Sequence, residues 1–287
     1  MRPPITRVEI TRSRFLTSAL IALLSGAAPA RAHATAAPPA KESRFPMTLT
    51  DDQRKHLLQA LAPLNAQYDP AEKMLRTRLS TPGYHSKLKA GMVHSTRDSL
   101  SYAAALLDTG DPALVQRGQD IISRVIALQD QDPESKTYGI WSWFLEETLA
   151  EMSPPDWNWA DFCGVPLLQA VLYHRATLPA DLTARIDAAI HHAAASIRKR
   201  NVGPDYTNIA VMGTYVTLIA AETYDDADLK QYAMARLRRF HDYSVENGGF
   251  TEYNSPNYTI TALSELGRLR LHVRDEEARR LVEAVYR

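Results

Sequence analysis

The sequence predicts an all-α fold built from pairs of antiparallel helices, with buried inner helices and amphipathic outer helices. Apolar residues recur with a helical period through most of the chain. From about residue 95 onward the helical segments come in pairs joined by short turns, and long polar connections separate one pair from the next. No segment shows the alternation of a convincing strand, apart from short pieces inside the long connections.

The first 34 residues have the pattern of a secretory signal peptide. Arg12 and Arg14 precede a short apolar run at residues 15–24, and residues 30–34 supply small side chains around a cleavage site. The apolar run is too short to span a bilayer. We therefore expect a periplasmic or secreted protein without membrane association once this segment is removed. Residues 35–47, rich in alanine and proline, predict a flexible lead-in.

The remaining residues, 48–287, are expected to form one domain. Thr50, followed by Asp51 and Asp52, is a good N-terminal cap for a first helix that continues through residues 56–61. We expect a second helix at residues 70–80. These two segments precede the paired helices.

Helical pairs with short internal turns make up the rest of the chain. They cover residues 98–107 with 113–129, 161–175 with 181–200, 208–223 with 227–246, and a last pair that begins near Ile260 and Glu276. In the later pairs the first helix is the more apolar one. Residues 209–221 are apolar nearly all round, which predicts burial on both sides. Their partner, residues 229–241, carries one lysine and three arginines and should face solvent.

Buried inner helices that alternate with amphipathic outer helices predict an α/α toroid. A linear α-solenoid is the alternative for any array of helical hairpins. The pairs differ in length and share no repeat signature, which favours a closed ring. We count about five hairpins, and residues 281–287 stop within an apolar helical pattern. Because a toroid of the commonest kind has six hairpins, we expect a domain truncated at its C-terminus.

The long connections are expected to gather at one end of the bundle. They lie at residues 132–160, 200–208 and 247–259, and two antiparallel helices always separate one from the next. The opposite end would then hold only tight turns. Functional residues tend to lie on loops that a rigid scaffold holds. We therefore place the candidate site at the end with the long connections.

The connection at residues 247–259 carries the richest cluster of reactive groups. Two glycines end the preceding helix, and Glu252, Tyr253, Asn254 and Tyr258 follow close together. An ordinary capped loop would account for the glycines and for one polar group, but not for this collection. We interpret Glu252, Tyr253 and Tyr258 as candidate catalytic residues and Asn254 as a candidate substrate-binding residue.

A second cluster opens the apolar helix at residues 208–223. Asp205, Tyr206, Thr207 and Asn208 lie where a turn enters that helix. Asp205 or Thr207 could simply cap it, which would leave Tyr206 and Asn208 facing the centre. We interpret Asp205 and Tyr206 as candidate catalytic residues and Asn208 as a candidate substrate-binding residue.

All four tryptophans of the chain lie in the longest connection. Indole faces can stack on the apolar C–H faces of sugar rings, while carboxylates and amides bind the hydroxyls. The alternative is that tryptophans fasten a long loop to the bundle, which we expect for two of the four. Glu146 and Glu147 are interpreted as part of a solvated helical turn. The candidate substrate-binding residues in and beside this loop are Trp141, Trp143, Trp157, Trp159, Asp156 and Asp161.

A fourth candidate group lies before the helix at residues 98–107, and so at the same end. His94 could act as a base, and Lys87 or Arg97 could meet an anion. His85 is a further candidate for substrate binding. Ordinary surface residues are an equally good interpretation of this group.

Other signals are interpreted as structural. The acidic residues at 225–228 lie in a short turn at the opposite end, and the histidine pair at 191–192 lacks a partner at metal-ligand spacing. Cys163 opens an inner helix and is expected to be a small buried hydrophobe. No phosphate-binding or dinucleotide motif is present, so we expect no cofactor and no metal. The chain without residues 1–34 is slightly acidic, which gives no reason to expect a nucleic-acid partner.

With these loops in place, the chain resembles the six-hairpin α/α-toroid carbohydrate-active enzymes, which include glycosidases and the helical domains of several polysaccharide lyases. The resemblance covers roughly residues 98–287. It is carried by residues 205–210 and 252–258, which each open an inner helix. It implies an enzyme that acts on a polysaccharide or oligosaccharide, and it does not single out one family.

Two cleavage mechanisms remain open. In a uronate lyase, an amide or a cation neutralises the substrate carboxylate, a tyrosine or histidine removes the neighbouring proton, and a tyrosine protonates the leaving oxygen. The acid–base candidates are Tyr253, Tyr258, Tyr206 and His94, with Asn208 and Asn254 as neutralisers. The excess of tyrosine and asparagine favours the lyase.

A glycoside hydrolase needs two carboxylates across the scissile bond, about 5–5.5 Å apart for retention or about 6.5–9.5 Å for inversion. Glu252 with Asp156, Asp161 or Asp205 could supply them. The lack of an arginine within the main motif favours this alternative. A third class comprises a non-catalytic sugar-binding scaffold and a toroid dehydratase for an apolar substrate.

Overall fold

The computed structural model describes residues 43–45, 48–80 and 83–287, and over these residues the fold is mostly helical, as predicted. The elements are α2 (Asp51–Asn65), β1 (Tyr68–Asp69), β2 (Met74–Leu79), β3 (Gly91–His94), α3 (Thr96–Asp108), α4 (Pro112–Ile126), α5 (Trp159–His174), α6 (Ala180–Arg200), α7 (Thr207–Tyr224), α8 (Ala227–Glu246), α9 (Pro256–His272) and α10 (Glu276–Tyr286). Within these residues no helix has the length and apolar character needed to cross a membrane. The predicted signal peptide lies outside them.

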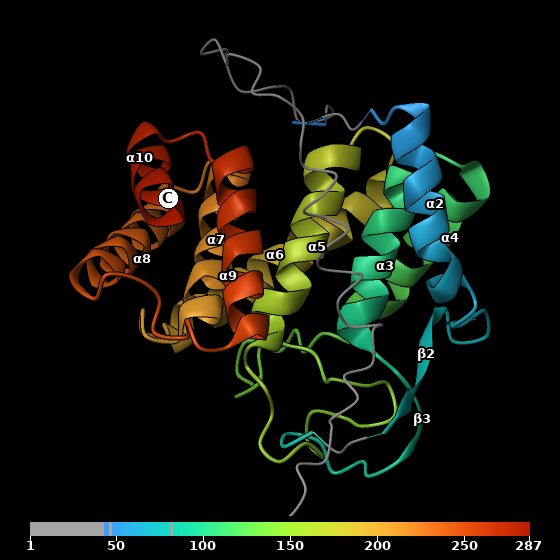
Figure 1. Ribbon diagram of the computed structural model, residues 1–287. Coiled ribbons are helices and arrows are strands. Elements are labelled where there is room, and N and C mark those ends of the chain that lie inside the picture. The colour runs from blue at the N-terminus through green and yellow to red at the C-terminus, as the bar shows by residue number, and fades with distance from the viewer. Residues whose placement is uncertain (1–42, 46–47, 81–82) are drawn as a thin grey trace, which may run out of the picture.

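The helices form two layers (Figure 1). In the inner layer α3 packs against α5, α5 against α7, and α7 against α9. Each inner helix also packs against the outer helix that follows it in the chain, namely α4, α6, α8 and α10. Over the described residues, α9 does not pack extensively against α2 or α3, so the inner row is open at that side. The two predicted layers are therefore present, whereas closure into a ring is not observed.

Side-chain caps fix where the helices begin. Thr50 and Gln53 form a complete capping box at α2, in which each side chain accepts a hydrogen bond from the other residue's backbone N–H. Asp226 caps α8 and Asp275 caps α10 in the same way as Ser255 caps α9. The predicted starts of α7, α8 and α10 lie within one residue of the structure, whereas α9 begins at Pro256 and not near Ile260.

The helix predicted at residues 70–80 is wrong, because this segment contains a strand. β2 lies between β1 and β3 in a three-stranded antiparallel sheet. Leu75 and Leu79 are buried on one face, whereas Arg76 and Arg78 are exposed on the other. That alternation has the period of a strand, and the pairing with β3 decides between the two structures.

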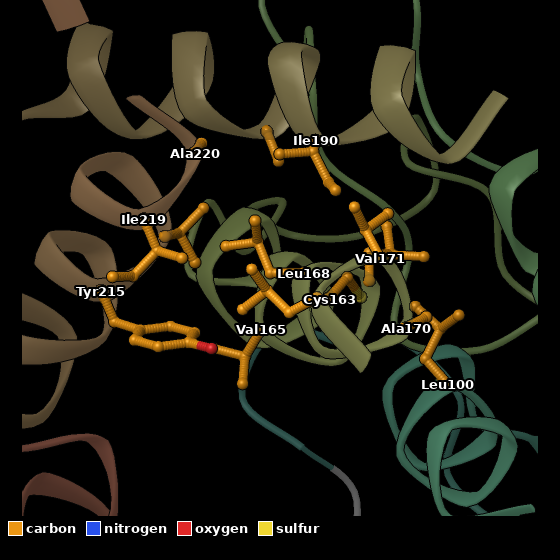
Figure 2. Close-up of a cluster of buried hydrophobic side chains, with 14 of the residues drawn as sticks. Leu100, Cys163, Val165, Leu168, Ala170, Val171, Ile190, Tyr215, Ile219 and Ala220 are labelled. Atoms are coloured by element: carbon orange, nitrogen blue, oxygen red, sulfur yellow. The ribbon is translucent and has the colours of Figure 1, made fainter. Parts of the chain in front are cut away.

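The hydrophobic core surrounds α5, which is apolar on nearly every side. Figure 2 shows Leu168 of α5 among side chains from three other helices, including Leu100 of α3, Ile190 of α6 and Ile219 of α7. Cys163 lies in this cluster and is fully buried, as predicted. Burial raises the pKa of its thiol well above the ordinary value, which suits a packing role. The core therefore holds the inner helices rigidly beneath the loops.

Part of the stretch predicted as a flexible lead-in is held against the bundle. Arg44 donates hydrogen bonds to Glu222 at 3.0 Å and to the carbonyl oxygen of His272 at 2.8 Å. The backbone N–H of Phe45 donates to the carbonyl oxygen of Leu172 at 2.9 Å. These contacts reach α5, α7 and α9, so the segment joins three inner helices at the end with the tight turns.

A buried histidine joins the same three helices. His272 of α9 hydrogen-bonds to the hydroxyl of Tyr173 on α5 through Nε2 and to that of Tyr215 on α7 through Nδ1. Burial lowers the pKa of His272 to about 3, and the nearby Arg268 and Arg44 act in the same direction. The imidazole is therefore neutral, with one nitrogen that donates to a tyrosine and one that accepts.

Candidate functional site

The long loops meet at one end of the bundle, as predicted (Figure 1). Asn158, before α5, donates to the hydroxyl of Tyr206, before α7, at 3.0 Å. The backbone N–H of Asn208, in the first turn of α7, donates to Glu252, before α9, at 2.8 Å. Two hydrogen bonds thus connect three loops that lie far apart in the sequence.

Tyr206 is the centre of the polar group at this end. Its hydroxyl oxygen accepts from Asn158 Nδ2, and Asn158 Oδ1 in turn accepts from the guanidinium of Arg200. Asp156 Oδ1 accepts from the backbone N–H of Asn158 at 3.0 Å and fixes that turn. Burial raises the pKa of Tyr206, whereas Asn158 and Arg200 act to lower it. The tyrosine therefore lies in a chain of hydrogen bonds that ends on a cation.

Two more tyrosines lie near Tyr206. Tyr84 and Tyr258 both interact electrostatically with its hydroxyl, and Asp156 acts on Tyr84 and Tyr206 alike. Tyr84 and Tyr258 are 77% and 44% exposed, so they form the outer part of the group. We call Tyr206, Asn158, Asp156, Arg200, Tyr84 and Tyr258 the Tyr206 cluster.

Asp161 lies beneath this cluster rather than on its surface. It is only 2% exposed, and its Oδ1 has no hydrogen-bond partner among the described residues. Burial raises the pKa of Asp161 to about 7, although Arg236 and Arg200 act to lower it. At this depth the carboxyl can influence a ligand through the electric field but does not contact it from solvent.

The four tryptophans mainly fasten the long loop. Trp141 is fully buried, Trp159 is nearly so, and Trp143 and Trp157 are partly exposed. The indole N–H groups donate, in chain order, to Val125 O, Asp156 Oδ2, Lys136 O and Thr96 Oγ1. The rings of Trp143 and Trp159 also stack on each other at 4.9 Å. Only Trp143 and Trp157 are therefore placed to offer part of a ring to a ligand.

His94 is held between two carboxylates. Its Nδ1 contacts Glu146 Oε1 at 2.5 Å, and its Nε2 contacts Asp69 Oδ2 at 3.3 Å. Glu146 and the neighbouring Glu147 were predicted to lie in a solvated helical turn. Glu146 is indeed exposed in a turn, whereas the prediction is wrong for Glu147. Glu147 is 2% exposed and accepts from the backbone N–H of Lys87 at 2.6 Å. The two glutamates therefore join the long loop to the segment around β3.

Of the remaining predicted residues, His85 lies near the Tyr206 cluster, whereas the others belong to the loops around Glu252. His85 contacts the carbonyl oxygen of Pro154 through Nδ1 at 2.7 Å, beside the ring of Trp143 and so near the Tyr206 cluster. Asp205 is exposed and acts on Glu252, whose pKa is raised first by burial. Tyr253 and Asn254 are exposed, and over the described residues their side chains do not hydrogen-bond to that cluster.

Sequence reasoning missed three members of the Tyr206 cluster. Arg200 stands where a predicted helix ends and a long connection begins, Asn158 lies between Trp157 and Trp159, and Tyr84 precedes His85, but none of the three was assigned a role. The run of basic residues in the last turn of α6 was the available signal for Arg200, since that turn ends beside the loops.

No set of three or more histidine, cysteine, aspartate or glutamate side chains suited to a metal ion occurs in the part of the chain that the structure describes. The chemistry available to the Tyr206 cluster is that of a tyrosine, a guanidinium, an amide and a carboxylate.

Comparisons with known proteins give one match. The model of a family described as a domain of unknown function (DUF8769) matches residues 56–275, which include every helix from α3 to α9. No curated protein and no solved structure matches the chain.

Proposed function

The chain belongs to the DUF8769 family, and we propose that its Tyr206 cluster cleaves an acidic polysaccharide by β-elimination. The substrate would be a polymer that contains a uronic acid, and the product would carry an unsaturated uronate. This proposal identifies the end with the long loops as an active site. It also treats the two-layered helical array as an arc of an α/α toroid.

The reaction requires a cation or an amide at the substrate carboxylate. When the carboxylate is neutralised, the adjacent C–H becomes acidic enough for a side chain to remove the proton. The C–O bond to the neighbouring sugar then breaks, a C=C bond forms, and the leaving oxygen takes up a proton. Arg200 and the amide of Asn158 have the chemistry for the first of these tasks.

The observation that carries the proposal is the hydrogen-bond chain from Arg200 through Asn158 to Tyr206. Because Asn158 donates to the Tyr206 oxygen, the proton of that hydroxyl remains free to be given to a leaving group. The same amide and the cation lower the pKa of Tyr206 against the larger, raising effect of burial, and so favour the phenolate that can accept a proton. One residue can thus serve as base and acid, with Tyr84 and Tyr258 beside the entering sugar.

A glycoside hydrolase is the second candidate, and Glu252 favours it. The pKa of this glutamate is raised by burial and by Asp205, which is the behaviour of a general acid. However, Glu252 Oε2 is engaged by the backbone N–H of Asn208, where it caps α7. A capping role explains its position without a reaction, so we rank the hydrolase below the lyase and a non-catalytic sugar-binding scaffold third.

The predicted signal peptide fits an extracellular polymer as substrate, and we propose a periplasmic or secreted location. The test is to express the chain in a bacterium and determine the N-terminal residue of the protein in the periplasm. Cleavage near residue 34 is the expected result, and an intact first residue in the cytoplasm would overturn the location.

The decisive experiment follows the ultraviolet absorbance of an unsaturated uronate alongside reducing ends, on a panel of uronic-acid and neutral polysaccharides. We expect both signals to rise together on a uronate polymer. Tyr206→Phe should then lower kcat by about a hundredfold or more, because it removes an acid–base group. Reducing ends without absorbance would replace the lyase by the hydrolase and Tyr206 by Glu252.

Tyr138→Phe is the matched control. Tyr138 is also half-buried, lies in the longest loop and hydrogen-bonds to another side chain, His192, at 2.6 Å. Loss of that hydroxyl should leave kcat unchanged. Equal loss in both variants would show that Tyr206→Phe acts through the fold, and a folded wild type that is silent on the whole panel would sink the carbohydrate-cleaving proposal.

A further inference from the structure

A buried carboxylate with an unpartnered oxygen is unusual, because its desolvation is not offset by a hydrogen bond. Asp161 Oδ1 is such an atom. Asp161 belongs to the first turn of α5, directly after the loop that supplies Asp156 and Asn158. It therefore lies between the rigid helical layer and the Tyr206 cluster, and neither the cap of α5 nor the proposed reaction uses it.

Three charged groups face Asp161. Arg236 from α8 is the cation with the larger effect, and its Nη2 and Asp161 Oδ1 both lie beside Gly213. Arg200 from α6 is the second cation and donates to Asn158, which lies one helical turn before Asp161, and Asp156 from the preceding loop is the anion. Arg236 is fixed, because its guanidinium donates to the carbonyl oxygens of Ala210, Val202 and Ile209. The guanidinium group of Arg236 is thus held at the start of α7 and cannot reorient toward a ligand.

Arg200 is differently placed. Over the described residues, the single acceptor of its guanidinium is Asn158 Oδ1, and the side chain is only partly buried. It therefore has donors left for a ligand. Arg200 acts electrostatically on Asp161 on one side and on Tyr206 on the other. Any anion that binds beside Tyr206 must share this cation with Asp161.

We propose that Asp161 is a counter-charge that Arg200 shares with the fixed Arg236, and that it thereby controls how strongly the Tyr206 cluster binds a carboxylated sugar. When Asp161 is ionised, it offsets part of the positive charge that Arg200 presents. When Asp161 is protonated, the full charge is available to the substrate carboxylate. This inference rests on the proposed function and adds a regulation of the same site by pH.

The surroundings make such a switch effective near neutral pH. Charges interact far more strongly in a buried, low-dielectric setting than across water. Burial raises the pKa of Asp161 to about 7, so its charge changes in the neutral range. Because linkage is reciprocal, a bound carboxylate must in turn favour the protonated form of Asp161. Binding at pH 7 should therefore take up a proton.

The binding test uses isothermal titration calorimetry with galacturonate, mannuronate and glucuronate-containing oligosaccharides, and a neutral xylo-oligosaccharide as reference. Wild type should bind the preferred uronate on the order of three- to tenfold more weakly at pH 8 than at pH 6. Asp161→Asn should bind it equally at both pH values, with the affinity of wild type at pH 6 and without proton uptake. Arg200→Met should bind weakly at both.

A second arm needs no sugar. A carboxyl whose folded pKa is raised makes stability fall as pH increases from its ordinary value of 3.8 through about 7. The difference in Tm between wild type and Asp161→Asn should follow this course. Arg200 lowers the pKa of Asp161, so the Tm difference between the proteins with and without Asp161 should have its midpoint at a lower pH when Arg200 is present. In the Arg200→Met background this midpoint should lie at a higher pH.

The outcomes separate the two claims. An unchanged midpoint in Arg200→Met would overturn the pairing of the two residues. A pH dependence of uronate binding that persists in Asp161→Asn would overturn the regulation. If the midpoint moves but no uronate binds to folded wild type, the proposed substrate is wrong, and the regulation of its binding falls with it.

Discussion

His272 shows how burial sets the chemistry of a single residue. Its imidazole lies between Tyr173 and Tyr215 and is fully buried. A proton on both nitrogens would leave a charge without solvent and would force both tyrosines to accept. The neutral form joins α5, α7 and α9 through a donor and an acceptor, so the residue stabilises the inner layer only while it is uncharged.

Acid should therefore weaken the fold through His272. Its folded pKa of about 3 lies below the ordinary value of 6.5, so unfolding takes up a proton between these values and stability falls as pH decreases through that window. This residue should contribute a slope of about 1.4 kcal/mol per pH unit between pH 6 and 4. Urea unfolding of wild type and His272→Gln across this range measures the difference in slope.

His56→Gln is the control for this measurement, because His56 is an exposed histidine on α2. Its slope should match that of wild type. A His272→Gln variant that is less stable by the same amount at every pH would contradict a neutral buried histidine and would point to lost packing alone.

Residue types in a pattern predicted part of the candidate site. Tyr206 and Asp156 were found because aromatic and acidic residues stood out in long loops. Arg200 was not, because an arginine at a helix end has an ordinary role there. Glu147 was misread because nothing in its local sequence reveals that the backbone of Lys87 reaches it from a distant loop. The residue type shows which chemistry a side chain can perform, but its hydrogen-bond partners depend on tertiary contacts.

Helix α7 determines how closely the inner and outer helices pack against each other. Its residues from Thr207 to Glu222 are all buried. Gly213 lies in the middle, and a Cβ there would be 2.6 Å from Asp161 Oδ1 and 2.9 Å from Arg236 Nη2. The missing side chain thus makes room for two charged groups from α5 and α8. A better helix former would fit this position worse.

Gly213→Ala should destabilise the fold by about 1–3 kcal/mol through overpacking, although alanine is favoured over glycine within a helix. Gly267→Ala in α9 is the matched control, since a Cβ there has no heavy atom within 4 Å. That change should stabilise the protein by up to about 1 kcal/mol. Thermal unfolding of both variants tests the pair, and equal effects would contradict the close approach at Gly213.

Helices were easier to predict than strands for a physical reason. Every hydrogen bond of a helix is local, so period and caps such as Thr50 or Asp275 are sufficient to find it. β2 depends on β3, which lies beyond a long loop, with Thr77 opposite Val93. A short alternating segment such as β2 can therefore be mistaken for a helix when the strand that pairs with it is not known.

At the scale of the whole molecule, stability should be graded from the centre outward. Among the described residues, α7 packs against α5, α6, α8 and α9, whereas α10 packs extensively against α8 and α9 alone. Backbone amides of α7 should therefore exchange with solvent most slowly and those of α10 among the fastest of the helices. Hydrogen exchange followed by mass spectrometry measures this order, and equal protection of both helices would show that the array opens only as one unit.

The contacts of Arg44 impose an order on the making of this protein. Its partners Glu222 and His272 lie 178 and 228 residues further along the chain. During translation, Arg44 is synthesised long before either partner. Arg44 can join the ends of the three inner helices only after His272 has left the ribosome, and contacts of such long range form slowly. These two hydrogen bonds of Arg44 therefore cannot both form in a growing chain until residue 272 has been added.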